Sequence, residues 1–400
     1  MSSMTDDAWR PIPFVRLDLD APAQPDSLLN AARARVEVER GGQIVGVMEA
    51  SVVDGHWSSN TIEDATKRFE DVKVDRGRVD DDQLPSISVV VPTICVEPAQ
   101  LMRTVDSLLA LDYPRFDILV VDNRTDARTP LPSFSDAERV RCVSELRPGI
   151  SAARNRGIAE ASGDVVAFTD DDVSVDAGWL RAIGTSFALH PEVEGVGGLV
   201  MPRELDTQPQ LWFEEFFGGF SHSFQASLMS NELSRESDPM FPYSPGRFGA
   251  GCNMAFRRTS LERVGGFNLA LGTGTLSKGG EDLAMFLALA LGGATLAFEP
   301  AALVRHSHRY TEAAFLKQVF GYGAGLTAMY SAFVAAHPRE LAHIVARMPR
   351  AYRQLTRSPA ERYSSTEPTY PRSCRVRQLL GMAYGPIAYA RSLVAARHYK

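Results

Sequence analysis

Residues 163–173, Gly-Asp-Val-Val-Ala-Phe-Thr-Asp-Asp-Asp-Val, decide how the rest of the chain is interpreted. A turn leads into the apolar run 165–168, which is typical of a short buried strand. This strand ends in Asp170, Asp171 and Asp172. Adjacent acids repel one another and lose hydration where a sheet edge buries them, and such a cluster is usually tolerated because a cation is bound there. Taken alone, the triplet is more simply a solvated, helix-capping turn, and it is the accompanying residues that favour the cation. Hard oxygen ligands of this kind suit Mn²⁺ or Mg²⁺.

The composition narrows the class of protein. The 400 residues are 44% hydrophobic and 23% charged, as in an ordinary globular protein. The net charge of −7, from 42 basic and 49 acidic residues, argues against a general nucleic-acid binder. The four cysteines form no Cys-x-x-Cys pair, as expected of reduced thiols in the cytoplasm. Residues 1–10 are acidic and polar and predict no signal peptide. The apolar stretch 283–298 is expected to be a core helix followed by a strand, and 319–336 a packed helix, with an interfacial helix as the alternative, so no membrane span is predicted.

The pattern divides the chain into three parts, residues 1–84, 85–310 and 311–400. In the leader, residues 1–84, the alternating segment 34–40 is followed by Gly-Gly and by 43–47, which predicts a hairpin, and a helix is expected over 61–74. This small α+β leader shows no chemistry of its own. Packing or partner binding is therefore its expected role.

From residue 85 the pattern alternates strands and helices. Buried strands are predicted at 87–93, 117–123 and 139–143, with helices at 99–109 and from residue 149. That order predicts an α/β fold with a doubly wound sheet, in which ligands bind beyond the carboxyl ends of the strands. The polar residues at those ends are Thr93, Asp122, Asn123, Asp170, Asp171 and Asp172. The common glycine-rich phosphate cradles are absent, so metal, arginine and backbone N–H groups would meet phosphate charge.

Later motifs follow in a recognisable order. The segments are 89–93, 121–123, 149–157, 170–172, 249–258 and the Gly-Gly-Glu-Asp of 279–282. With these, the chain resembles the family 2 glycosyltransferases over about residues 85–310. The resemblance implies a GT-A fold, which is a Rossmann-like doubly wound mixed sheet, and an inverting transfer from a nucleotide sugar.

The resemblance also implies a nucleotide site. Pro92 and Thr93 would line it beside Asp122, and Arg154 would supply a fork of hydrogen-bond donors and positive charge. Asn123 stands where many family members have an aspartate that accepts the uracil N3–H. An amide can donate or accept, so the base stays open.

The resemblance implies a metal site as well. Asp170 is expected towards the ribose and the metal, Asp172 directly on the metal, and Asp171 in contact with the nucleotide. His306 resembles a later histidine that completes the site in many members. His308 offers the same chemistry two residues away, on the same face of a strand, so spacing does not choose between them.

Asp282 is expected to be the general base. Inversion at an anomeric carbon needs a carboxylate that takes the proton of the attacking hydroxyl, while a divalent metal neutralises the leaving diphosphate. Glu281 is expected to contact acceptor or sugar hydroxyls. The alternative is that both acids merely cap the helix that starts there.

We therefore expect a metal-dependent inverting glycosyltransferase that moves a sugar from a nucleoside diphosphate sugar, UDP first, to a hydroxyl of a cell-envelope glycan, a lipid-linked sugar or a small-molecule secondary metabolite. One alternative is a nucleotidyltransferase, although the glycine-rich, basic signature near the first strand is absent. The other is a non-catalytic sugar-nucleotide binding module, against which Asp170, Asp172 and Asp282 argue.

Two segments outside these motifs carry further expectations. The aromatic stretch 212–224 predicts either a buried helix or a platform for the acceptor. The C-terminal helical extension, 311–400, holds eleven basic residues against two acids from Arg347 onward. Segment 378–396 is a candidate amphipathic helix for peripheral contact with the inner face of a membrane, with a solvated basic helix as the alternative.

Overall fold

The structure is a computed structural model, and it describes residues 9–23, 28–58, 60–74, 77–126, 130–134, 136, 138–221, 223–234, 240–356 and 370–397, without the side chains of 348 and 350–356. Residues 1–8, most of the segment predicted to lack a signal peptide, lie outside this description. The predicted boundaries at residues 84 and 310 stay predictions.

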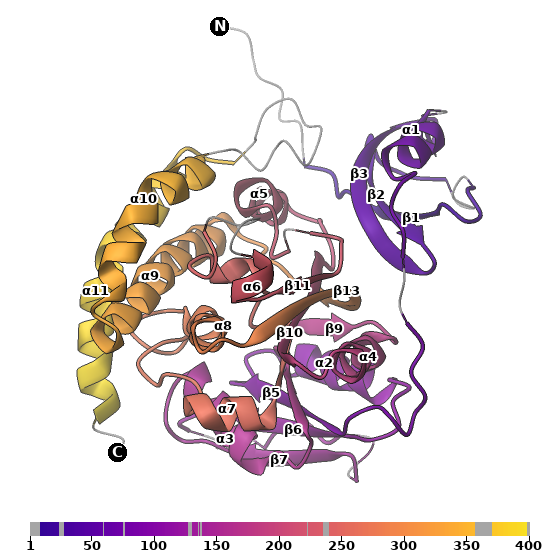
Figure 1. Cartoon of the computed structure of the whole chain (residues 1–400). Coiled ribbons are helices and arrows are strands. Elements are labelled where there is room, and N and C mark those ends of the chain that lie inside the picture. Colours follow the sequence, from indigo (N-terminus) through magenta and orange to yellow (C-terminus); the bar gives the residue numbers. More distant parts are fainter. Residues whose placement is uncertain are drawn as a thin grey trace, which may run out of the picture.

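The leader forms a small sheet covered by one helix (Figure 1). Its strands are β1 (Phe14–Asp18), β2 (Arg33–Arg40), β3 (Gln43–Val53) and β4 (His56–Trp57), in that order across the sheet, and its helix is α1 (Thr61–Arg68). Apolar side chains of the sheet and of α1 share one core, which includes Leu17, Val36 and Phe69. The predicted hairpin is the antiparallel pair β2–β3.

The large sheet is mixed and, within the described residues, has nine strands. Its order is β11-β13-β10-β12-β8-β5-β6-β7, with β9 paired to β13. The strands are β5 (Ile87–Thr93), β6 (Phe116–Asp122), β7 (Val140–Ser144), β8 (Val165–Phe168), β9 (Val173–Val175), β10 (Val193–Pro202), β11 (Ser227–Met229), β12 (Met254–Arg257) and β13 (Thr295–His306). Strands β7, β6, β5 and β8 run parallel, and β12 pairs antiparallel with β8. This confirms the predicted α/β class with a doubly wound, mixed sheet.

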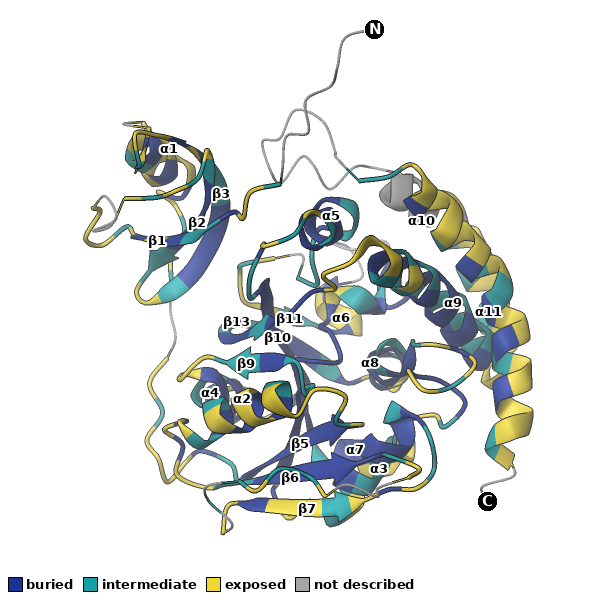
Figure 2. Ribbon diagram, turned by 180° about the vertical axis from the view of Figure 1, so that it is seen from behind, coloured by how far each residue is buried: buried dark blue, intermediate teal, exposed yellow. Residues whose placement is uncertain are grey.

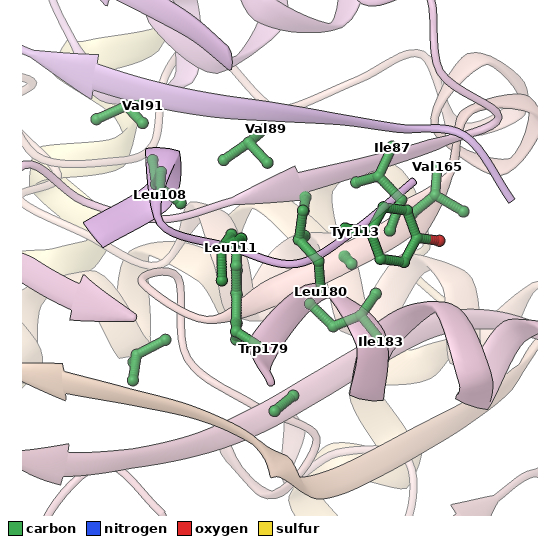
Figure 3. Packing of buried hydrophobic residues seen from close by; sticks show 14 of the residues in the cluster. Ile87, Val89, Val91, Leu108, Leu111, Tyr113, Val165, Trp179, Leu180 and Ile183 are labelled. Carbon is green, nitrogen blue, oxygen red and sulfur yellow. The ribbon is translucent and has the colours of Figure 1, made fainter. Parts of the chain in front are cut away.

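Helices cover both faces of the large sheet. They are α2 (Pro98–Leu109), α3 (Ile150–Glu160), α4 (Trp179–Leu189), α5 (Gln208–Phe217), α6 (Asn231–Ser234), α7 (Arg258–Val264) and α8 (Glu281–Leu291), with a 3₁₀ turn, η1, at Pro245–Arg247. Alternate residues of β5 point to opposite faces: Val89 packs with α2 and α4, whereas Val90 packs with α3 and α8. Figure 3 shows the first of these cores, where Trp179 and Leu180 approach the strands.

Three helices complete the chain on the side opposite the leader (Figure 1). They are α9 (Glu312–Ala336), α10 (Glu340–Thr356) and α11 (Ser373–Arg397). Among the described helices, α9 is long and apolar enough to cross a membrane, and 44% of its most apolar window is buried inside the protein. It packs closely on α11, where Gly381 and Gly385 let the backbones approach. Of the basic residues counted from Arg347 onward, Arg350, Arg353, Arg357, Arg362 and Lys400 lie outside the described side chains, as do the acids Glu361 and Glu367.

Candidate active site

Polar side chains gather where the parallel strands end. β5 ends at Thr93, β6 ends at Asp122, and the aspartate cluster follows β8. The hydroxyl of Thr93 donates to the carboxylate of Asp171, and the N–H of Asn123 donates to the carbonyl of Thr93 at 2.8 Å. Pro92 is buried within β5 next to this contact. The structure therefore places these predicted residues at one edge of the sheet.

Asp122 and Asn123 are held by other groups of the protein. The carboxylate of Asp122 accepts from Nε and Nη2 of Arg124 at 2.8 and 2.6 Å, and this contact lowers the pKa of Asp122. The amide of Asn123 donates at 2.8 and 2.7 Å to two carbonyls of the loop 145–147, and its Oδ1 accepts from the N–H of Gly149 at 3.0 Å. Asn123 thus fixes the loop that leads into α3. Base recognition by Asn123 stays a prediction, and it would have to coexist with these bonds.

Arg154 of α3 lies at the centre of the site, with 1% of its side chain exposed. Its Nη1 donates to Oε1 of Glu281 at 2.8 Å, and its Nη2 donates to Oδ1 of Asp170 at 3.2 Å and to the carbonyl of Gly251 at 3.0 Å. The guanidinium carbon also lies 5.5 Å from the centroid of the Phe267 ring. One buried cation therefore joins the aspartate cluster to the acids that begin α8.

Asp282 lies in the first turn of α8 and reaches the same loop. Its Oδ2 accepts from the N–H of Gly251 at 2.8 Å, and its Oδ1 accepts from the N–H of Leu283 at 2.8 Å. A Cβ at Gly251 would lie 2.9 Å from Nη2 of Arg154 and 3.1 Å from Oδ2 of Asp282, so glycine permits this approach. Gly251 and Arg154 therefore join Asp170 to Glu281 and Asp282 in one hydrogen-bonded network.

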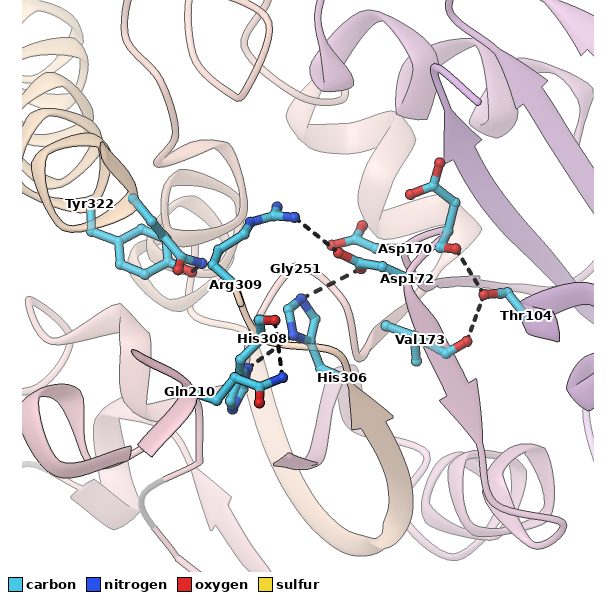
Figure 4. A network of polar contacts seen from close by, with 12 residues as sticks. Thr104, Asp170, Asp172, Val173, Gln210, Gly251, His306, His308, Arg309 and Tyr322 are labelled. Atoms are coloured by element: carbon cyan, nitrogen blue, oxygen red, sulfur yellow. Dashed lines mark hydrogen bonds and ion pairs between the residues drawn. The ribbon is translucent and has the colours of Figure 1, made fainter. Parts of the chain in front are cut away.

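His306 ends β13, and His308 follows it in a buried series of contacts (Figure 4). His306 Nε2 lies 3.5 Å from Asp172 Oδ1, and His306 Nδ1 lies 3.2 Å from His308 Nδ1. His308 Nε2 in turn lies 3.0 Å from Oε1 of Glu214 on α5. Arg309 lies on the other side, with Nη1 3.8 Å from Asp172 Oδ2. His306 therefore faces the aspartate cluster, while His308 faces away from it.

Asp172 and His306 together suit a divalent cation. Neighbouring ligands of an octahedral ion lie roughly 3 Å apart, close to the separation of these two atoms. Burial lowers the pKa of His306 to about 3, so its imidazole is neutral, which is the form that binds metals. Among the described residues, no three Asp, Glu, His or Cys side chains form a ready ligand set. An ion held by Asp172 and His306 would take its other ligands from water and from a bound molecule.

Several acidic side chains are buried together at this edge of the sheet, and their pKa values are raised. Burial raises the pKa of Asp170 and of Asp172, and it raises that of Asp171 to about 6. Burial, and then the charge of Asp282, raises the pKa of Glu281, while Arg154 opposes the shift. A raised carboxyl pKa means that the ionised form costs free energy in the folded state. A bound cation would offset this cost.

Sequence reasoning named Glu281 but missed a second buried acid. The carboxylate of Glu281 is buried against Arg154, and its expected contact with acceptor or sugar hydroxyls stays a prediction. Glu214 was overlooked inside the aromatic run of α5, where an acid among Phe and Trp residues is itself a signal of a buried polar contact. Phe220 of the same stretch stacks edge-on against the ring of His306, with centroids 5.0 Å apart. Residues 212–217 of this stretch thus belong to the helix α5, and Phe220 beyond it packs on His306 and His308.

Comparisons with known proteins indicate the family to which this part of the chain is similar. The model of the family described as "Glycosyl transferase family 2" matches residues 88–265. The chain is 32% identical over 191 residues to the glucosyl-dolichyl phosphate glucuronosyltransferase of Haloferax volcanii, a match that covers 46% of this chain and 57% of that protein. It is 27% identical over 264 residues to the pre-mycofactocin glycosyltransferase of Mycobacterium tuberculosis, covering 65% of this chain and 50% of that one. The chain thus spans between half and three fifths of the length of these relatives.

A solved structure with a related outline is the mannosyltransferase PcManGT from Pyrobaculum calidifontis in complex with GDP-Man and Mn²⁺. It is 19% identical, the match covers 84% of this chain and 81% of that one, and the TM-score is 0.46. The family match covers β5 from Ser88 onward, the Asp170–Asp172 cluster and Gly251, while Glu281, Asp282 and His306 of the site lie beyond it. Residues 88–265 of this chain are therefore a glycosyl transferase family 2 domain.

Proposed function

We propose that the protein is a metal-dependent inverting glycosyltransferase that moves one sugar from a nucleoside diphosphate sugar, with UDP as the first candidate, to a hydroxyl of its acceptor. The observation that carries this proposal is the junction at Arg154, which holds Asp170 and Glu281 together while Gly251 binds Asp282. Family membership of residues 88–265 supports the same reaction class.

In this reaction, each group of the site has a separate task. The acceptor oxygen bonds to the anomeric carbon as the bond from that carbon to the diphosphate breaks, and the acceptor proton passes to Asp282. Asp282 lies in the first turn of α8, and its carboxylate is held by the N–H groups of Gly251 and Leu283. Asp172 and His306 would hold the divalent ion, which when bound supplies positive charge for the leaving diphosphate. Arg154 keeps Asp170 and Glu281 oriented.

A donor panel tests the proposal. The protein is incubated with UDP-, GDP- and dTDP-sugars and Mn²⁺, and the release of nucleoside diphosphate by slow hydrolysis is measured with and without EDTA. We expect release from one donor class that stops on chelation. Pyrophosphate release from a nucleoside triphosphate would instead identify a nucleotidyltransferase, and binding without turnover would identify a binding module.

The acceptor class is proposed from the relatives. One is named for a glucosyl-dolichyl phosphate, a lipid-linked sugar, and another for pre-mycofactocin. We propose a lipid-linked or small-molecule acceptor for this chain, met in the cytoplasm at the inner face of a membrane. A cell-envelope glycan built on a lipid carrier falls within the same class.

Helix α11 supports the membrane location. Figure 2 shows that its outer side is exposed, and exposed apolar residues recur there at intervals of four or seven: Val376, Leu380, Ile387 and Val394. Exposed arginines flank this stripe at both ends of the helix, at positions 375, 377, 391 and 397. Apolar burial combined with attraction to anionic lipid is the expected mode of attachment. Flotation with phosphatidylglycerol vesicles should carry the protein, Ile387→Glu should reduce this, and equal flotation with neutral phosphatidylcholine would contradict the electrostatic part.

A further inference from the structure

The leader contacts the glycosyltransferase domain through two charged residues of β2 that are almost fully buried. Arg35 and Glu37 lie on the same face of the strand and are 2% and 1% exposed. Glu37 accepts from Nη1 and Nη2 of Arg305 at 2.6 and 2.7 Å, in a two-pronged pair. Arg35 Nη2 donates to Oε1 of Glu49 within the leader at 3.3 Å, and its Nη1 lies 4.0 Å from Oε2 of Glu214. Both partners adjoin the histidines: Arg305 precedes His306, and Glu214 contacts His308.

An apolar contact surrounds these pairs. Ile44 and Val47 of β3 pack with Leu199 and Met201 of β10 and with Phe298 and Leu303 of β13. The leader therefore packs against β10 and β13, and β13 ends at His306 of the site.

A continuous series of contacts runs from the leader to the aspartate cluster. It passes from Arg35 to Glu214, then to His308, His306 and Asp172. Gly219 lies close to the Glu214 carboxylate of this series: its φ is +71°, and a Cβ there would lie 3.0 Å from Oε1 of Glu214. Glycine at this position therefore leaves room for the carboxylate.

Hydrogen-bonding chemistry indicates which ring nitrogen of each histidine in this series carries a proton. Glu214, as a carboxylate, only accepts, so the proton it shares with His308 belongs to Nε2 of that ring. If the His308 ring carries only this one proton, its lone pair is on Nδ1, and the proton between the two Nδ1 atoms then belongs to His306. With its proton on Nδ1, a neutral His306 has its lone pair on Nε2, which is the atom that faces Asp172.

We propose that Glu214, which faces the guanidinium of Arg35 of the leader, is a positioning residue that fixes the tautomer of His306 so that Nε2 presents a lone pair to a divalent cation at Asp172. Such outer partners orient imidazole ligands in metal sites generally. This inference rests on the cation of the proposed function. It gives the leader a role in that function, because Arg35 of the leader is the outermost residue of the series.

The tautomer can be measured in the unmodified protein without metal. The full-length chain is labelled with ¹⁵N-histidine, and two-bond ¹⁵N–¹H correlation spectra distinguish Nδ1–H from Nε2–H rings among its eight histidines. The signal of His306 is assigned by its loss in His306→Gln. We expect His306 as the Nδ1–H form and His308 as the Nε2–H form. A His306 ring protonated on Nε2 would overturn the proposal, whether or not the protein binds metal or turns over donor.

Metal affinity provides the second readout. Mn²⁺ binding in the presence of UDP is measured by electron paramagnetic resonance of the free ion for wild type, Glu214→Gln and Arg35→Met. We expect about 10- to 100-fold weaker binding in Glu214→Gln, as is typical when an outer partner of a ligand is lost, and a smaller loss of the same sign in Arg35→Met.

Glu37→Gln is the matched control, because it disrupts an equally buried contact between the leader and the domain that does not pass through His308. Its Mn²⁺ affinity should stay within about threefold of wild type. Equal losses in Glu37→Gln and Glu214→Gln would show that docking alone matters and would overturn the proposal. Unchanged affinity in Glu214→Gln would do the same. Absence of Mn²⁺ binding in wild type would instead count against the metal of the proposed function, and the tautomer measurement would still decide the arrangement of protons.

Discussion

Replacing Arg154 by methionine removes the one buried cation that joins Asp170 to Glu281, while keeping an unbranched side chain of similar length. The Glu281 carboxylate is 7% exposed and its bond to Nη1 is 2.8 Å long, so the variant leaves a buried acid without its partner. Removing one member of a buried ion pair costs about 3–5 kcal/mol of unfolding free energy. For a domain of this size, that corresponds to a fall in Tm of roughly 10 °C, at about 2–4 °C per kcal/mol.

The assay is urea unfolding followed by tryptophan fluorescence, with Arg156→Met as the control. Arg156 lies on the same helix and pairs with Glu160 at 2.8 Å, but the two side chains are 42% and 31% exposed, so its loss should cost less than about 0.5 kcal/mol. Without Arg154 the pKa of Glu281 should rise further above its unfolded value. The folded variant would then bind a proton that the unfolded chain does not, so its deficit should shrink as the pH falls from 8 to 5. A loss no larger than that of Arg156→Met, or one independent of pH, would refute the reasoning.

Further predictions concern the cation and the loop beside it. Asp172→Ala should weaken Mn²⁺-dependent UDP binding by at least about tenfold in calorimetry, and unchanged affinity would rule out its metal role. Because burial raises the pKa of Asp171 from 3.8 to about 6, folding takes up protons between these values, so the stability of the metal-free protein should fall as the pH rises through that window. The rise in Tm caused by Mn²⁺ should therefore be larger at pH 8 than at pH 5, and an equal rise at both would contradict this account. Gly251→Ala should displace Arg154 or Asp282 and lower donor turnover more than it lowers stability, and wild-type turnover would show that the close approach is unimportant.

Much of the fold could be predicted because buried parallel strands carry continuous apolar runs. The predicted strand 87–93 is β5 residue for residue, and the predicted strand 117–123 is shifted by one residue in β6. Because parallel strands end at the same edge of the sheet, the polar residues that follow them lie at that edge whatever path the loops take. Sequence order alone was therefore enough to predict which residues gather there.

The outer parts of the site could not be predicted in this way. Arg35 and Glu37 alternate with apolar residues of β2, a pattern that ordinarily indicates a solvated face. Arg35 pairs with Glu49 of the neighbouring strand, but it also faces Glu214 of α5, and Glu37 pairs with Arg305 of β13, both far along the chain. The spacing of His306 and His308 could not separate their roles, because the two rings lie in series and only one faces Asp172. The hydrogen bonds of Asn123 depend on a loop whose path no local pattern fixes.

The measurement that tests the central claim most directly is the hydrolysis of the preferred donor by Asp282→Asn, compared with the affinity of the same variant for UDP and Mn²⁺. Asparagine keeps the shape of the side chain and can still accept from the N–H of Gly251, but it cannot take a proton. We predict that UDP–Mn²⁺ affinity stays within about threefold of wild type while turnover falls by roughly 10²- to 10⁴-fold, the usual range for loss of a general base. Turnover close to that of wild type would contradict the account, because the proton would then have another destination.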